Sequence, residues 1–145
     1  MNFLKFCKQI LYFFIGGSGY VALEWLWRGW SHISMFFAGG LCFLLLGKLQ
    51  KYRLPLPLRA LSGAGIITAV EFIAGLLFNR DYQVWDYREL PLNFKGQICL
   101  RFFLLWIPIG LGAMWLYGLL QRLPAMPRRF AASARHQPYS PGGHK

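Results

Sequence analysis

The chain has 145 residues, of which 56% are hydrophobic, 18% are aromatic and only 14% are charged. A soluble domain carries about a quarter charged residues, so this composition excludes an ordinary soluble protein and indicates a small membrane domain. The formal net charge is +11, but the lysines and arginines lie in short segments between apolar runs. This pattern indicates membrane orientation and attraction to anionic lipid at the inner face, and it excludes nucleic acid as the expected partner.

Four apolar segments predict an all-α fold, a four-helix transmembrane bundle with an ordered outer loop before the last helix. The transmembrane domain is expected over residues 1–121, with helices at about 9–27, 30–47, 60–79 and 96–121. The second helix is the shortest, and the sequence leaves open whether it crosses the membrane fully or is tilted or re-entrant. Residues 122–145 are rich in Pro, Gly, Ser and Arg, which predicts a flexible basic cytoplasmic tail.

The basic residues indicate how the bundle is oriented. Most of the 16 lysines and arginines lie before the first helix, between the second and third helices, and in the tail. The positive-inside rule therefore predicts a multi-pass protein with cytoplasmic N- and C-termini. All 5 acidic residues then lie in the outer half of the membrane or outside it.

The segment 60–79 contains one ionisable residue, Glu71, near its middle. A carboxylate at this depth is costly in lipid, so it is expected to face protein or water and is a candidate functional residue. At 100° per residue, Glu71 shares a helix face with Ala64, Thr68 and Gly75, and small residues on a face allow close helix packing.

The same helical geometry brings polar residues of the other segments towards one interior. Two interpretations of this cluster remain open: a binding or proton-titrating site for a small polar solute, or a charge network that only specifies helix packing. Arg101 is expected to pair with an acidic member of the cluster. The predicted outward-opening polar cluster consists of Glu24, Arg28, His32, Glu71 and Arg101.

The outer loop, residues 79–97, is rich in aromatic residues, as is typical of an interfacial belt. Asp86 and Asn93 are candidates for capping turns, and Pro91 and Gly96 indicate a turn followed by a helix start. The loop is expected to be either a folded cap over the bundle or a lid or docking surface.

Catalytic signatures are missing from the sequence. There is no phosphate-binding loop, zinc-protease motif or nucleophile elbow, so the chain is not expected to be an enzyme. The 3 cysteines do not lie at metal-ligand spacing with a histidine, and no metal site or other cofactor is predicted.

Several segments together resemble the bacterial membrane family described as putative ABC transporter type IV, over about Leu11 to Leu120. These segments are Trp27–His32, Gly39–Phe43, Glu71–Gly75 and Val84–Cys99. A small residue is expected after the loop tyrosine, where this chain has Arg88. The resemblance implies that the family's motif positions are occupied by Glu24, Glu71, Trp85, Asp86, Tyr87, Pro91, Asn93 and Gly96.

The resemblance implies a permease-like or accessory transport subunit in the bacterial cytoplasmic (inner) membrane. Because the chain has no nucleotide-binding motif, that role requires a separate ATPase. Because four spans are few for an ABC permease, it also implies self-association into a homo-oligomer. The alternative is a structural or regulatory membrane protein that docks a partner through the Trp85–Gln97 loop. Substitution of Glu71 separates the two hypotheses, because only the first requires its carboxylate to act on a solute.

Overall fold

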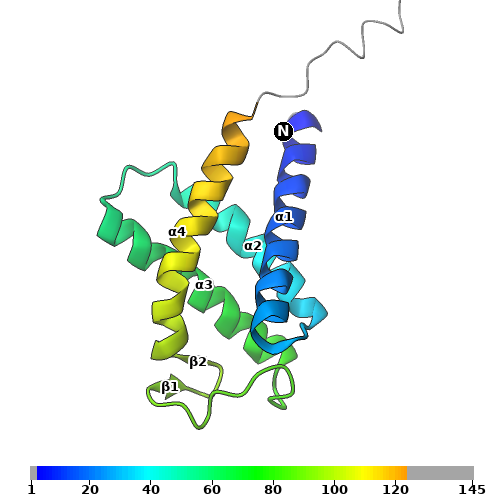
Figure 1. Ribbon diagram of the computed structural model, residues 1–145, viewed down its shortest axis with the longest axis vertical. Coiled ribbons are helices and arrows are strands. Elements are labelled where there is room, and N and C mark those ends of the chain that lie inside the picture. Colours follow the sequence, from blue (N-terminus) through cyan, green and yellow to red (C-terminus); the bar gives the residue numbers. More distant parts are fainter. Residues whose placement is uncertain (1–2, 124–145) are drawn as a thin grey trace, which may run out of the picture.

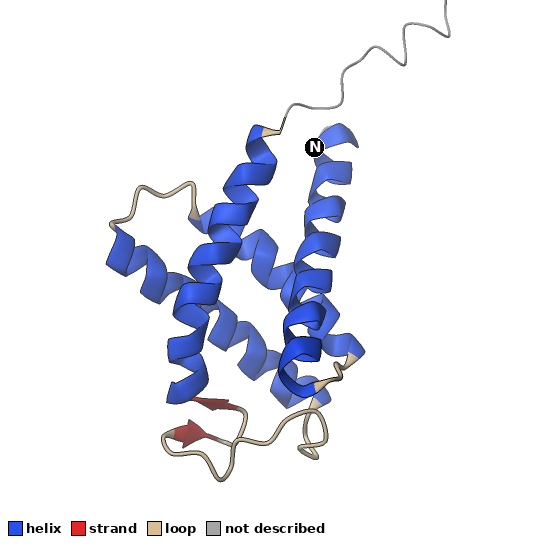
Figure 2. Ribbon diagram, in the orientation of Figure 1, coloured by secondary structure: helices blue, strands red, loops and turns tan. Residues whose placement is uncertain are grey.

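The computed structural model describes residues 3–123, which form four helices and one short β-hairpin (Figures 1 and 2). This confirms the all-α prediction, because the hairpin is a minor addition. The expected tail falls almost entirely outside the described residues. The elements are α1 (Phe3–Arg28), α2 (Ile33–Leu49), α3 (Leu56–Phe78), β1 (Asn93–Phe94), β2 (Ile98–Cys99) and α4 (Leu100–Arg122).

The helices alternate in direction, so the connections gather at two opposite ends (Figure 1). The start of α1, the α2–α3 connection and the end of α4 lie at one end. The α1–α2 turn and the long segment between α3 and α4 lie at the other end, which we call the outer end. In Figure 1, α1 and α4 cross in front of the more distant α2 and α3.

The composition of the helices is that of a membrane protein. Within residues 3–123, α1, α3 and α4 are long and apolar enough to cross a bilayer. Helix α2 is also apolar but has 17 residues, and at about 1.5 Å per residue it is near the lower limit for a span. Large apolar side chains such as Leu26 and Trp115 are 86% and 69% exposed, as expected for side chains that face lipid.

Four helix pairs pack in the bundle: α1 packs most extensively on α2, α4 packs on α3, and α2 also packs on α3 and α4. The α1–α2 contact is built on glycines, because Gly16 and Gly39 leave no room for a Cβ atom between the two backbones. Helices α2, α3 and α4 enclose a cluster of buried side chains, which comprises Cys42, Leu46, Ala64, Ile67, Trp106 and Met114.

The helix ends differ from the expected bounds for local reasons. Helix α3 begins at Leu56, before the expected residue 60, because a proline in the first turn needs no backbone donor and is compatible with the helix. Helix α4 begins at Leu100, later than expected, because Asn93 pairs with Cys99 in the hairpin. Helix α1 begins at Phe3 and so includes the first two lysines.

Candidate functional site

A cavity of about 380 Å³, here called the outer chamber, lies between α1, α3 and α4 near the outer end of the bundle. Its wall contains three acidic residues, Glu24, Glu71 and Asp86, and one basic residue, Arg28. Most of the remaining wall is aromatic. The aromatic residues are Tyr20, Trp27, Trp85, Tyr87, Phe102 and Trp106.

Glu71 lies at the base of this chamber and is 5% exposed. The Tyr87 hydroxyl donates to one carboxylate oxygen at 3.0 Å, and the Trp106 indole N–H donates to the other at 3.0 Å. Burial and the nearby Glu71 raise the pKa of the Tyr87 phenol above its ordinary value, which keeps it a donor. Both donors are neutral, and within residues 3–123 no cationic side chain forms an ion pair with Glu71.

Glu24 and Arg28 form a second polar unit at the end of α1. The Arg28 guanidinium lies 2.7 Å from one Glu24 oxygen, and the Ser31 hydroxyl donates to the other at 2.5 Å. Arg28 also donates to the Val84 carbonyl and lies 4.1 Å from the centre of the Trp30 ring. The charge of Arg28 is therefore matched within its own helix, and its side chain ties α1 to the outer loop.

His32 does not line the outer chamber. Its Nδ1 accepts from the Ser34 amide at 3.2 Å and lies 2.7 Å from the Ser34 hydroxyl, so it caps the start of α2. It borders a separate depression that includes Asn79 and Val84.

Arg101 also lies outside the cluster, and the expected pairing with Glu71 or Glu24 is not found. Its side chain is exposed, and it makes no ion pair within the described part of the chain. Helix α4 turns Phe102 and Trp106 towards the chamber, and adjacent residues are about 100° apart around a helix axis. Helix α4 therefore presents large aromatic residues to the outer chamber and not Arg101.

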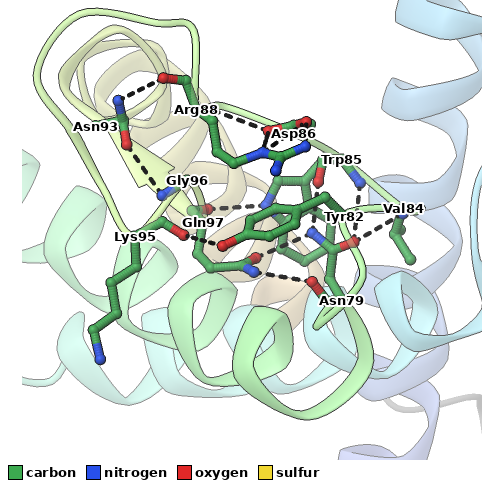
Figure 3. A network of polar contacts seen from close by, with 10 residues as sticks. All are labelled: Asn79, Tyr82, Val84, Trp85, Asp86, Arg88, Asn93, Lys95, Gly96 and Gln97. Atoms are coloured by element: carbon green, nitrogen blue, oxygen red, sulfur yellow. Dashed lines mark hydrogen bonds and ion pairs between the residues drawn. The ribbon is translucent and has the colours of Figure 1, made fainter.

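The outer loop is held by a buried amide clamp, which consists of Asn79 and Gln97 (Figure 3). The Asn79 Nδ2 donates to the Trp85 carbonyl at 2.6 Å and to Gln97 Oε1 at 3.0 Å. The Asn79 Oδ1 accepts from the Val84 amide at 2.8 Å. The Gln97 Nε2 completes the clamp by donating to the Asn79 carbonyl at 2.9 Å.

The clamp positions Trp85 and Tyr87 over the chamber. The Trp85 indole donates to the Gln97 carbonyl at 2.9 Å, which fixes the ring against the end of α3. Tyr87 then stacks on Phe102 with ring centres 4.6 Å apart, and its hydroxyl reaches Glu71. Sequence reasoning did not select Asn79 and Gln97 as site residues. Their position in the sequence could have indicated them, because these two amides stand at the two ends of the loop, next to membrane-spanning segments.

The other predicted residues of the outer loop make their polar contacts within the loop. Asp86 and Arg88 form an exposed pair at 2.7 Å, and this guanidinium holds the pKa of Asp86 below its ordinary value. The Asn93 side chain donates to the Leu90 carbonyl at 2.8 Å and accepts from the Gly96 amide at 3.1 Å. Pro91 lies exposed in the same turn.

Gly96 is the loop residue whose substitution has the clearest local consequence. Its φ is +63°, and a Cβ atom would overlap the Cγ of Arg88. We expect Gly96→Ala to cost about 1–2 kcal/mol of unfolding free energy, because an L-residue is strained in the left-handed region. Denaturant unfolding in detergent micelles measures this cost. Gly29→Ala is the matched control, because Gly29 has a φ of +78° but open space around a Cβ. The overlap with Arg88 should make the Gly96→Ala loss the larger of the two, and equal losses would contradict this.

Residues 11–134 match the family model described as putative ABC-transporter type IV. Searches of curated proteins and of solved structures found no match.

Proposed function

We propose, since this chain belongs to the putative ABC-transporter type IV family, that it is a permease-like or accessory subunit of a membrane transport system. We further propose that its outer chamber binds a small polar solute at Glu71. The chain is proposed to bind and conduct or position this solute and not to act as an enzyme.

One observation carries the proposal: the Glu71 carboxylate is buried beside a chamber and has only neutral donors around it. Removing a carboxylate from water is costly unless a proton or a cation compensates its charge. Within residues 3–123 the charge of Arg28 is already matched by Glu24. A cationic solute, or a proton that it exchanges with, is therefore the missing partner of Glu71.

The alternative in which the whole cluster only fixes helix packing is less well supported. A charge network of this kind would pair Glu71 with a cation of another helix, and among the described residues only the neutral donors Tyr87 and Trp106 bond to it. The Glu24–Arg28 pair fits the structural role, because it links α1 to the loop.

The family match supports membrane-associated partners. We propose a separate ATPase that supplies energy, self-association of the chain, and anionic lipid at the inner face. We also propose a bacterial cytoplasmic membrane location with both termini in the cytoplasm. This orientation is favoured by basic residues at the start of α1 and around the α2–α3 connection, which lie at the end opposite the outer loop (Figure 1). These residues are Lys5, Lys8, Lys48 and Lys51.

The test compares wild type with Glu71→Gln in detergent micelles, by thermal unfolding across a panel of small organic cations, neutral solutes and pH values. We expect a cation to stabilise the wild type and Glu71→Gln to weaken its binding at least tenfold, because a charge-assisted contact is worth about 1.5–3 kcal/mol.

The control is Glu89→Gln, an exposed loop carboxylate that lines no part of the chamber. It removes the same charge and should leave the cation response unchanged. The proposal fails if both variants respond like the wild type, or if Glu71→Gln only lowers stability and no solute stabilises the wild type.

A second candidate function is partner docking through the Trp85–Gln97 loop. It is favoured by Leu92 and Phe94, which are 75% and 56% exposed on a loop that is otherwise held in place. Crosslinking of wild type and a Leu92→Ser, Phe94→Ser double variant in membranes tests it. A crosslinked partner lost in the double variant but retained in Glu71→Gln supports docking, whereas identical patterns contradict it.

A further inference from the structure

A second cavity, here called the inner chamber, lies next to the outer chamber and has a volume of about 390 Å³. It is lined by α1, α2 and α4, with Ile67 from α3, and it opens at the seam between α1 and α4, where Leu23, Gly112 and Leu116 are exposed. Its wall is almost wholly apolar. Ile15, Leu46, Ala113 and Leu116 are typical members.

The two chambers adjoin along the seam between α1 and α4. Tyr20, Leu23, Trp106 and Ile109 line both of them. The Tyr20 and Trp106 rings are 5.7 Å apart and mark the boundary. Helix α1 packs mainly on α2, and helix α4 packs mainly on α3, so the seam between α1 and α4 is open (Figure 1).

We propose that the two chambers bind one amphiphile, whose positively charged amine head lies at Glu71 and whose single hydrocarbon tail lies in the inner chamber. This inference rests on the proposed function, because it names the class of solute that the Glu71 site takes. The adjoining chambers supply one polar and one apolar half, and these halves match the two ends of such a molecule.

The outer chamber suits an amine head for two reasons. Glu71 supplies a carboxylate that no described cation neutralises, within reach of the chamber. The surrounding wall contains six aromatic rings, and the faces of such rings attract ammonium groups when water is excluded. An amine head supplies a positive charge to the deprotonated Glu71, which a neutral or anionic head does not.

The inner chamber suits a hydrocarbon tail because of its shape and chemistry. Gly19 on α1 and Gly112 on α4 both line it, and a Cβ atom on either would meet nothing within 4 Å. This apolar lining offers water few hydrogen-bond partners, and the opening at the α1–α4 seam can admit a hydrocarbon chain from the lipid side. A small polar solute would not use this space, whereas an alkyl chain would fill it.

The experiment is photolabelling of the full chain in maltoside micelles. One probe is dodecylamine with a diazirine on its terminal carbon, and the matched probe is the corresponding dodecanol. A short probe, butylamine with the same group, reports on the head site alone. Labelled residues are mapped by mass spectrometry, with and without excess unlabelled dodecylamine.

We expect the dodecylamine probe to label α1 or α4 residues of the inner chamber, such as Ala113 and Leu116, and unlabelled dodecylamine to suppress this labelling. The dodecanol probe should label them at least tenfold less. Gly112→Leu fills the chamber and should abolish tail labelling, whereas Gly65→Leu, an equally uncrowded helical glycine that lines neither chamber, should not.

The remaining outcomes overturn the inference in distinguishable ways. If amine and alcohol label the inner chamber equally, it is a lipid-tail site with no head recognition. If labels fall only on lipid-facing residues such as Leu26, the tail lies outside the chamber. In either case, the proposed function stands if the short probe labels residues near Glu71 and unlabelled dodecylamine suppresses that labelling. If the short probe does not label this site either, both proposals fail.

Discussion

Replacing Asn79 with alanine should release the outer loop and cost about 3–5 kcal/mol of unfolding free energy. Asn79 is 1% exposed, and its amide group bonds to Trp85, Val84 and Gln97. Alanine leaves buried backbone groups without partners, and each such group costs about 1–3 kcal/mol. Denaturant unfolding in micelles measures the total, and hydrogen exchange over residues 80–97 locates the loss.

The control for this prediction is Gln83→Ala. Gln83 is an exposed amide of the same loop and does not belong to the clamp. We expect its free energy of unfolding to stay within about 0.5 kcal/mol of the wild type. Equal effects of the two substitutions, or unchanged exchange rates in Asn79→Ala, would show that the clamp does not hold the loop.

Replacing Gly39 with valine should separate α1 from α2 and prevent a stable bundle. A Cβ atom on Gly39 would overlap the Cβ of Tyr20 and approach the Gly16 carbonyl to 2.9 Å. These atoms belong to or adjoin the α1 backbone, so a rotamer change cannot relieve the overlap. Overpacking costs about 1–3 kcal/mol when side chains can yield, and here we expect a loss at or above the upper end.

The measurement for Gly39→Val is the unfolding midpoint in micelles, together with the fraction of monodisperse protein. Gly65→Val is the matched control, because Gly65 lies in a membrane helix with nothing within 4 Å of a Cβ. It should change the free energy of unfolding by less than about 0.5 kcal/mol. Similar losses in both variants would assign the effect to valine in a helix and not to the α1–α2 contact.

Much of the fold could be predicted from the sequence because transfer from water into lipid depends on local composition. Each helix follows from an apolar run, and the carboxylate at position 71 had to face protein or a cavity because lipid excludes it. Both conclusions need only the hydropathy of a single segment. The burial of Glu71 at 5% exposure agrees with this argument.

The rotation of α4 could not be predicted in this way. Lipid tails and protein interior are both apolar, so a helix that is apolar all round has no hydropathy signal for its buried face. The assumption that small residues mark the interior agreed with α3, where Gly75 is buried. It held only in part for α4, where the large Trp106 is buried as well as Gly110, and Arg101 is exposed.

The sequence by itself therefore determined the class of the protein, its four helices, the ordered loop and the inward position of Glu71. Only the tertiary structure decided the neighbours of that carboxylate, the amide clamp of Asn79 and Gln97, and the two chambers along the α1–α4 seam. The physical reason is that burial of apolar segments is a local transfer energy. Helix rotation and loop hydrogen bonds, in contrast, depend on which side chains from distant segments meet.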